Sequence, residues 1–269
     1  MRTSGVLMHI SSLPSDFGIG TLGIEAYKFI DFLKKSGQTY WQVLPLCPTS
    51  YGDSPYQSFS TFAGNPYFID FDLLYKGGLL KKNDYSSVNW GENQEKVDFQ
   101  TIYKNRFKVL RKAYTNFDLT DKSYLDFCDK NTYWLDDFAL YMTLKDSFDG
   151  KPWNEWEKVL KTRKSTVIEK VKKELKNEIE FQKFIQYEFF VQWSNLKKYA
   201  NENGILIIGD IPIYVAGDSA DVWSNPKNFL LDEDCNPIEV AGCPPDAFTE
   251  DGQLWGNPLY DWEYMKKNN

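Results

Sequence analysis

Residues 5–46 read GVLMHISSLPSDFGIGTLGIEAYKFIDFLKKSGQTYWQVLPL, and the order of their apolar runs decides the fold class. The runs at 5–10 and 40–46 are short and apolar, as buried strands are. Between them, residues 24–35 place apolar side chains at intervals of three and four, which predicts an amphipathic helix, and Gly37 follows as its C-terminal signal. Strand, helix and strand in this order predict a βαβ unit with a parallel sheet.

A third repeat of the same kind lies further along the chain. Residues 181–200 are predicted to form an apolar helix that packs on the sheet, and Gly204 separates this helix from the run ILII at 205–208. Because ILII is apolar on both sides, it is typical of a parallel strand that is covered on both faces. We therefore expect three neighbouring parallel strands.

The region between the second and third strands has a different character. Residues 72–180 are rich in charge and carry helical periodicity, for example at 165–180, where one helix with a solvated face of Lys and Glu is predicted. We therefore expect three parts: residues 1–71 with two strands, a helical insertion subdomain at 72–180, and residues 181–269 with the third strand and a long loop.

The composition argues against several classes of partner. The 269 residues carry 31 basic and 38 acidic side chains, a net charge of −7, so the surface repels nucleic acid and anionic membranes. No apolar run reaches the roughly 18 residues of a membrane span, and no signal peptide is recognised. The four cysteines are scattered, and His9, the only histidine, is interpreted as structural. We expect a cytoplasmic protein with reduced thiols and no metal; the oligomeric state is left open.

Three loops combine aromatic rings with acids, amides and hydroxyl groups. They read YGDSPYQSFSTFAGNP at 51–66, GDIPIYVAGDSADVW at 209–223 and PPDAFTEDGQLWGNPLYDW at 244–262. Pyranose rings present flat C–H faces that stack on aromatic side chains, and their hydroxyls need short polar partners. We therefore predict a sugar-binding cleft on which the three loops converge.

Single residues in these loops admit two interpretations. Asp210 follows the run at 205–208, at the carboxyl end where ligands bind in parallel α/β folds, and it either faces a ligand or caps the next element. Asp218 and Asp221 are interpreted as a turn residue and a helix start. Trp255 lies in GQLWGNP, where the glycines and the proline favour an exposed ring on a loop, with loop packing as the alternative.

Gly18, Gly20 and Gly23 form a G-x-G-x-x-G pattern, which marks a dinucleotide site when it makes a tight turn between a strand and a helix. The preceding strand is predicted to end near Ile10, too early for such a turn. No acid follows the second strand at Leu46 to bind a ribose hydroxyl. A nucleotide-dependent oxidoreductase is kept only as a third alternative.

Six blocks together resemble the amylomaltases, the bacterial 4-α-glucanotransferases of glycoside hydrolase family 77, and they occur in the family's order over the whole chain. They are GVLMHISSLPSDFGIGTLG, YWQVLPL, YGDSPYQSFSTFAGNPYFID, GDIPIYVAGDSADVW, AGCPPDAF and GQLWGNPLY. The resemblance implies an α/β fold, a (β/α)8 TIM barrel with helical insertions, of which this chain would hold the first three strands. It also implies retaining transfer of α-1,4-glucan segments between malto-oligosaccharides through a covalent glucosyl enzyme, with no cofactor.

The resemblance also implies roles for single positions. Those beside the cleaved bond are Tyr56 and Asp210, with Ser54 nearby. Those on a mobile loop that covers the acceptor side are Phe248, Gln253 and Trp255. Those of a second glucan-binding site outside the catalytic cleft are Tyr51 and Tyr103.

The chain departs from the family pattern in two respects. Ala247 stands where a related enzyme has a second aromatic ring, which predicts a thinner acceptor platform. The family's nucleophile is an Asp in an Arg-x-Asp-His motif, and neither this motif nor the acid/base Glu beyond it is present; no Asp-His pair occurs at all. We therefore expect an N-terminal fragment of about half a family member, inactive alone, with its catalytic carboxylates beyond Asn269. The alternative is a non-catalytic α-glucan-binding module.

Overall fold

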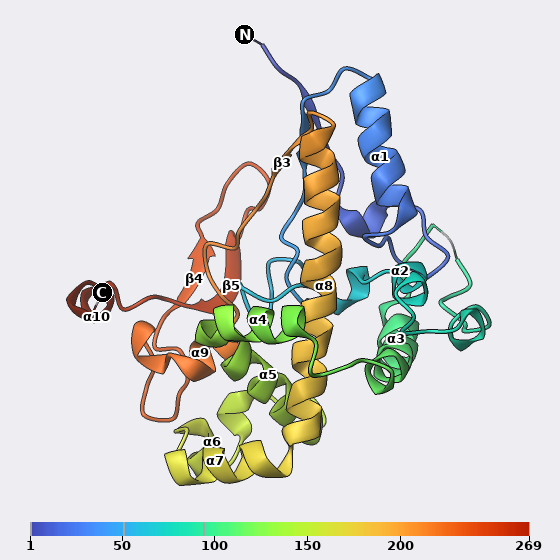
Figure 1. Cartoon of the computed structure of the whole chain (residues 1–269). Coiled ribbons are helices and arrows are strands. Elements are labelled where there is room, and N and C mark those ends of the chain that lie inside the picture. The colour runs from blue at the N-terminus through green and yellow to red at the C-terminus, as the bar shows by residue number, and fades with distance from the viewer. Residues whose placement is uncertain (1, 51, 94, 269) are drawn as a thin grey trace. The chain divides into compact units, whose positions relative to one another are not determined.

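The computed structural model describes residues 2–50, 52–93 and 95–268 (Figure 1). The chain forms two compact units, each built from three separate segments. Unit 1 contains Met1–Pro48, Gly64–Lys130 and Lys183–Ile211. Unit 2 contains Thr49–Ala63, Asn131–Gln182 and Pro212–Asn269.

Unit 1 is organised around a three-stranded parallel sheet. Its strands are β1 (Gly5–Leu7), β2 (Tyr40–Gln42) and β3 (Leu206–Ile208), in the order β1-β2-β3. Both ladders are parallel, and Trp41 of β2 pairs with Val6 on one side and Ile207 on the other. The predicted set of three neighbouring parallel strands is confirmed, although each strand is shorter than its apolar run.

One face of this sheet is buried against helix α1 (Ile24–Lys35), which begins and ends where the sequence predicts. Trp41 is fully buried, and its ring meets Phe29 of α1 edge-on at 5.2 Å. The Trp41 indole donates to the Met8 carbonyl at 2.7 Å, so its polar atom is satisfied inside the core. Each strand thus presents its central residue to the helix side.

The other face of the sheet is exposed, and here the expectation of a strand covered on both sides is wrong. Leu7 is 54%, Leu206 48% and Ile208 42% exposed. Side chains alternate along a strand, so Leu206 and Ile208 point away from the face that carries Trp41. The sheet therefore offers an apolar surface that the described residues leave open to solvent.

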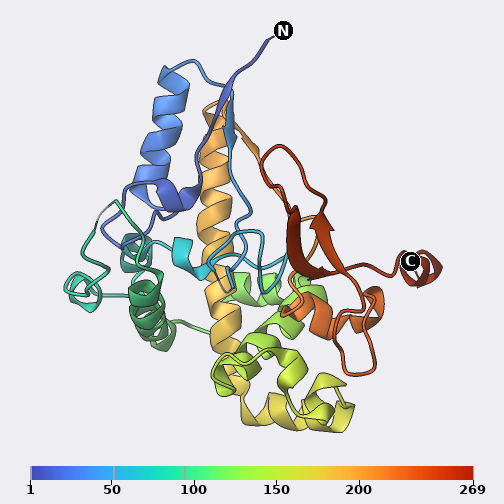
Figure 2. The same ribbon diagram turned by 180° about the vertical axis from the view of Figure 1, so that it is seen from behind.

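Helix α8 (Lys176–Glu202) begins in unit 2, and its C-terminal part packs in unit 1. Figures 1 and 2 show that part lying alongside α1, and the Tyr199 hydroxyl donates to Asp31 of α1 at 2.7 Å. Phe184 and Ile185 are fully buried on the inner side of α8. The apolar helix predicted at 181–200 is thus present, but it starts earlier.

Two glutamines of α8 bind backbone groups near the end of the first predicted sugar loop and just beyond it. Gln186 accepts from the Gly64 amide at 2.7 Å and donates to the Gly64 carbonyl at 3.0 Å. Gln192 makes the same pair of bonds with Asp70, at 2.7 and 3.2 Å. Both glutamines are buried, so these amide pairs satisfy groups that water does not reach. They fix residues 64–70 against the helix.

The glycine pattern near the N-terminus is explained by close packing. A Cβ on Gly20 would lie 1.8 Å from the carbonyl oxygen of Ile10, and a Cβ on Gly23 would lie 2.0 Å from Oδ2 of Asp70. A larger residue at either position collides with its neighbour. The pattern therefore serves the fold of unit 1.

The remaining elements of unit 1 connect the sheet to α8. They are the helices α2 (Phe71–Lys76), α3 (Phe99–Thr115) and α4 (Lys122–Lys130), and three short 3-10 helices at Ile10–Ser12, Pro66–Phe68 and Lys82–Asp84. Arg106 of α3 is fully buried, donates to the Pro66 carbonyl at 3.2 Å and lies 4.4 Å from the centre of the Phe71 ring. This cation replaces its lost hydration with a carbonyl and a ring face.

Unit 2 combines helices with a two-stranded antiparallel hairpin, which Figure 2 shows in red. Its elements are α5 (Thr132–Ser147), α6 (Lys158–Lys161), α7 (Ser165–Glu174), α9 (Ala220–Ser224), α10 (Trp262–Asn268), β4 (Val240–Cys243), β5 (Gln253–Pro258), and short 3-10 helices at Trp153–Glu155 and Pro226–Asn228.

Two expectations for unit 2 are corrected. The single helix predicted at 165–180 is divided at Leu175, where α7 ends before α8 begins. Trp255, expected on an irregular loop, belongs to strand β5. Helices α2 to α4 lie in unit 1, and α5 to α7 lie in unit 2. Within the described ranges, no helix has the length and apolar character needed to cross a bilayer.

Candidate functional site

In unit 2, helix α9 holds the first predicted sugar loop through the carboxylate of Asp221. This carboxylate accepts from the Thr61 amide at 2.8 Å and from the Ser60 hydroxyl at 3.4 Å. The amide of Ala220 donates to the Phe59 carbonyl at 2.8 Å. Burial raises the pKa of Asp221, and the bonds from Thr61 and Ser60 oppose this shift. Asp221 is a helix-start residue, as predicted, but its bond to a loop 160 positions earlier was missed.

A second link joins the same loop to strand β5. The side-chain amide of Gln57 donates to the Trp255 carbonyl at 3.3 Å and to Oδ1 of Asn257 at 3.0 Å. Asn257 in turn donates to the Val215 carbonyl at 2.9 Å. Three segments that are distant in sequence, and that the sequence predicts to converge, therefore share one chain of amide hydrogen bonds within unit 2.

Aromatic rings line the same part of unit 2. The rings of Tyr214 and Trp255 lie 6.4 Å apart, and Tyr214 stacks on Tyr260 at 6.0 Å with an interplanar angle of 17°. The Tyr260 hydroxyl donates to the Ile213 carbonyl at 3.0 Å. Trp255 remains 44% exposed, and its indole N–H donates to Oε1 of Gln253 at 2.9 Å. The Trp255 side chain is thus partly exposed and is oriented by its neighbours.

The other predicted residues of unit 2 are placed on exposed turns. Tyr56 is 44% exposed, and its amide donates to the Ser54 hydroxyl at 3.3 Å, which sets these two residues side by side. Phe248 is 93% exposed between β4 and β5. The carboxylate of Asp246 accepts from the amides of Phe248 and Thr249 at 2.8 and 2.9 Å and so shapes this turn.

Asp218 anchors the second predicted loop to helix α5. Its carboxylate accepts from the Lys145 ammonium at 2.5 Å, the Tyr141 hydroxyl at 2.6 Å and the Trp153 amide at 3.2 Å. Lys145 is only 3% exposed, so the ion pair is largely shielded from water. Burial, with the nearby charge of Asp218, raises the pKa of Tyr141, which therefore stays a neutral donor. The interpretation of Asp218 as a simple turn residue missed this role.

Asp210 and Tyr103 belong to unit 1 and are described there. Asp210 lies two residues beyond the end of β3 and is half-buried, at the carboxyl end of the parallel sheet as predicted. Tyr103 on α3 is 59% exposed, with its ring 5.6 Å from Phe107. Tyr51, its predicted partner in a second glucan site, lies outside the described residues.

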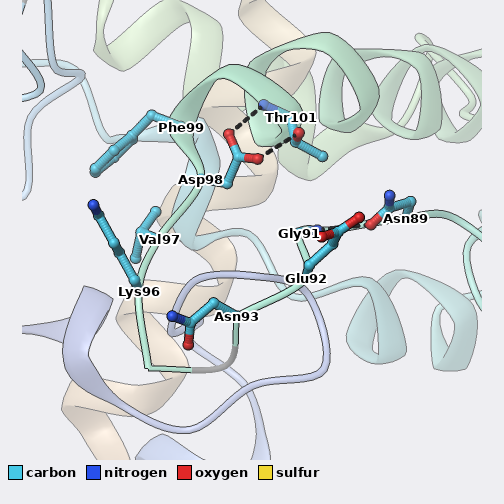
Figure 3. Close-up of a pocket in the computed structure, with 9 residues that line it drawn as sticks. All are labelled: Asn89, Gly91, Glu92, Asn93, Lys96, Val97, Asp98, Phe99 and Thr101. Carbon is cyan, nitrogen blue, oxygen red and sulfur yellow. Dashed lines mark hydrogen bonds between the residues drawn. The ribbon is translucent and has the colours of Figure 1, made fainter.

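A separate hollow of about 460 Å³ lies beside the start of α3 in unit 1 (Figure 3). It is lined by Asn89, Gly91, Glu92, Asn93, Lys96, Val97, Asp98, Phe99 and Thr101. The carboxylate of Asp98 faces Thr101 and accepts from its amide and hydroxyl at 3.0 and 2.8 Å, so it serves as the helix cap. None of the predicted site residues that the structure describes lines this hollow. Nor do the described residues contain a group of three His, Cys, Asp or Glu side chains suited to a metal ion.

Comparison with known proteins gives consistent results. The sequence profile of a family described as 4-alpha-glucanotransferase, Glyco_hydro_77, matches residues 8–269. A curated 4-alpha-glucanotransferase of Clostridium butyricum is 59% identical over 264 residues, and the match covers 97% of this chain and 54% of that protein. A curated protein of the same description from Aquifex aeolicus is 47% identical, with 99% and 54% covered. The chain spans about half the length of the curated relatives it matches.

Solved structures agree with the sequence matches. The amylomaltase of Streptococcus agalactiae, solved in complex with acarbose, is 47% identical with a TM-score of 0.96, and the match covers 100% of this chain and 55% of that one. The amylomaltase of Corynebacterium glutamicum is 17% identical with a TM-score of 0.77, covering 99% of this chain and 37% of that one. At that identity the second likeness shows the fold alone.

Proposed function

Because this chain belongs to the 4-alpha-glucanotransferase family, glycoside hydrolase family 77, we propose that it supplies the substrate-binding loops of an enzyme that transfers α-1,4-glucan segments between malto-oligosaccharides. The observation that carries the proposal is the chain of amide bonds from Gln57 through Asn257 to Val215. It joins the loop of Tyr56 to the strand of Trp255 within unit 2. Aromatic rings on a fixed backbone suit the flat faces of glucose units.

Each predicted residue has a proposed role that fits its chemistry. Tyr56, with Ser54 beside it, offers a ring face and a hydroxyl to the glucose unit next to the cleaved bond. The Asp210 carboxylate, which belongs to unit 1, is proposed to accept hydrogen bonds from sugar hydroxyls, since charge-assisted bonds are the stronger kind. On the acceptor side we place Phe248, Gln253 and Trp255. Tyr103 is proposed to offer its exposed ring to a second glucan site, the role that the family resemblance implies for it.

The sheet of unit 1 supports a barrel as the complete fold. We propose that β1, β2 and β3 are the first strands of a (β/α)8 barrel, with the inserted helices between β2 and β3. The exposed side chains of Leu7, Leu206 and Ile208 then face the barrel interior, where further strands cover them. Residues outside these 269 supply those strands, in keeping with the length of the relatives.

The reacting groups are proposed to lie outside residues 1–269. A retaining transfer needs two carboxyl groups roughly 5 to 5.5 Å apart, one as the nucleophile and one as the acid and base. Asp210 alone does not supply both. No Asp-His pair of the family's nucleophile motif occurs in this sequence. We therefore propose that Asp210 binds substrate and that residues 1–269 alone are inactive. The complete enzyme is proposed to be cytoplasmic.

A chimera tests this proposal. The chain is joined to the unmatched remainder of the Clostridium butyricum relative, and maltotriose is incubated with the chimera and with residues 1–269 alone. We expect the chimera to release glucose and longer malto-oligosaccharides, and the chain alone to release none. Acarbose, the ligand in the Streptococcus agalactiae structure, should inhibit the chimera.

Two results would contradict the proposal. A folded chimera that binds maltoheptaose in calorimetry without any transfer would favour a glucan-binding module. Transfer by the purified chain alone would show that both carboxyl groups lie within residues 1–269.

A further inference from the structure

We propose that Gln57 and Asn257 are positioning residues that hold the backbone of Trp255, and with it the acceptor side, in a fixed place relative to the Tyr56 loop. The consequence for catalysis rests on the proposed function. The hydrogen-bond geometry does not depend on it.

The directions of these hydrogen bonds are fixed by the chemistry of the groups. The carbonyls of Trp255 and Val215 can only accept, so each must face the NH2 group of the amide that it meets. Asn257 therefore turns its NH2 toward Val215 and its oxygen toward Gln57, at 2.9 and 3.0 Å. Gln57 uses its NH2 group for both Asn257 and Trp255. Exchanging oxygen for nitrogen in either side chain breaks the chain of bonds.

Strand β5 needs this support because its ladder is irregular at Trp255. Val240 of β4 pairs with Pro258, but Gly242 pairs with Leu254, so residues 255–257 lie opposite the single residue Ala241. Such a bulge interrupts the regular hydrogen bonds of a ladder and redirects side chains, often next to active sites. Gln57 supplies a bond to the Trp255 carbonyl at this interruption.

Burial makes the loss of these bonds costly. Asn257 is only 4% exposed, and the bond that it donates is buried. A buried amide that loses its partner carries an uncompensated desolvation cost, which strand β5 can avoid only by moving. A movement of β5 displaces Trp255, whose ring is exposed and proposed to contact the acceptor.

The test uses substitutions that keep the shape and change the donors. Gln57→Glu replaces the NH2 group by a carboxylate oxygen, which then faces the Trp255 carbonyl and the Asn257 side-chain oxygen. Asn257→Asp likewise places a carboxylate oxygen opposite the Val215 carbonyl. Gln57→Met removes the donors without adding charge, in case the charged variants do not fold. Gln38→Glu is the matched control, because the Gln38 amide makes a long exposed bond of 3.4 Å to Ser36 in unit 1.

Two readouts are measured on the chimera with a malto-oligosaccharide donor and glucose as the acceptor. Amide hydrogen exchange in Gln253–Pro258 should become about tenfold faster in the variants than in the control, as expected for the loss of about 1.4 kcal/mol of local stability. The KM for glucose should rise by a similar factor while kcat stays within about twofold. A purely structural role would instead lower Tm and the fraction of active enzyme at an unchanged KM.

Unchanged exchange in Gln253–Pro258 overturns the proposal. Faster exchange with an unchanged KM for glucose overturns it as well, because the bonds would then serve stability only. If the unsubstituted chimera transfers no glucan, the proposed function fails, and the exchange comparison still decides whether the two amides hold β5.

Discussion

Trp255 combines a partly exposed ring with a backbone held by Gln57. The contribution of the ring to acceptor binding can therefore be separated from its contribution to the free energy of unfolding. In the chimera, Trp255→Ala should weaken acceptor binding several-fold, because an aromatic contact is worth about 0.5 to 1.5 kcal/mol beyond simple burial. The free energy of unfolding should change little, since the ring is 44% exposed. Acceptor-dependence kinetics and thermal melts on the same protein measure both quantities.

Trp262→Ala is the control for this substitution, since Trp262 is 59% exposed on α10 and is not assigned to the site. If Trp255 serves packing instead, its truncation costs about 3 to 5 kcal/mol, as for a buried Trp. An early melt with normal acceptor affinity would contradict the assignment.

The ion pair of Asp218 and Lys145 provides the second residue-level prediction. Lys145 has a side chain that is 4% exposed, so Asp218→Asn leaves a shielded cation without its countercharge. We expect a loss of about 3 kcal/mol in the free energy of unfolding, at the lower end for a broken buried pair. Denaturant unfolding measures it. Glu174→Gln is the control, because it removes an exposed ion pair with Lys170 at 3.7 Å. This substitution should change the free energy of unfolding by no more than about 0.5 kcal/mol. Equal effects would contradict the shielded character of the first pair.

The sequence marks residues with a distinctive local context better than residues that support a loop from a distant part of the chain. Asp210 at a strand end and Trp255 between glycines are recognised from local context alone. Gln57, Asn257 and Asp221 carry no such mark, because an amide or a carboxylate in a polar loop is ordinary. Their partners lie about 160 to 200 positions away, and only the fold brings them together.

At the scale of elements, helix α8 contains a buried carboxyl group with a measurable consequence. Glu188 is 8% exposed, and desolvation raises its pKa to about 7 from the ordinary 4.5. Between pH 4.5 and 7, the Glu188 carboxyl is therefore protonated in the folded chain and ionised in the unfolded chain. Its contribution to the free energy of unfolding falls as pH rises through this window and is constant above it.

Glu188→Gln removes this pH dependence. At 1.36 kcal/mol per pKa unit, the variant should be more stable than the parent by at most about 3 kcal/mol at pH 8, and by little at pH 4. Urea unfolding at the two pH values measures the difference. Glu202→Gln, near the end of the same helix and paired with Lys198 at 3.9 Å on the surface, is the control. A Glu188→Gln variant whose advantage is the same at both pH values would contradict the raised pKa.

Elements with strong local patterns are predicted from sequence, and elements that depend on tertiary contacts are not. Helix α1 and the parallel order of β1, β2 and β3 follow from periodicity and from the βαβ rule. The break between α7 and α8 at Leu175 interrupts a continuous helical pattern, so no local signal marks it. The β4 and β5 hairpin was missed because its glycines and prolines resemble an irregular loop.

At the scale of the whole molecule, charge, sheet and length support one account. The net charge of −7 suits a neutral polysaccharide better than an anionic partner. The parallel sheet of unit 1 leaves an apolar face exposed, and the chain spans about half the length of its relatives. These features together are consistent with the proposal that the chain carries glucan-binding loops.

The loops of Tyr56 and Trp255 are proposed to form a glucan site within unit 2. A crystal structure of the chimera with acarbose tests it most directly. We expect a sugar ring stacked on Tyr56 and acceptor-side electron density next to Trp255. Acarbose bound elsewhere, with the side chains of Tyr56 and Trp255 both facing solvent, would contradict this proposal.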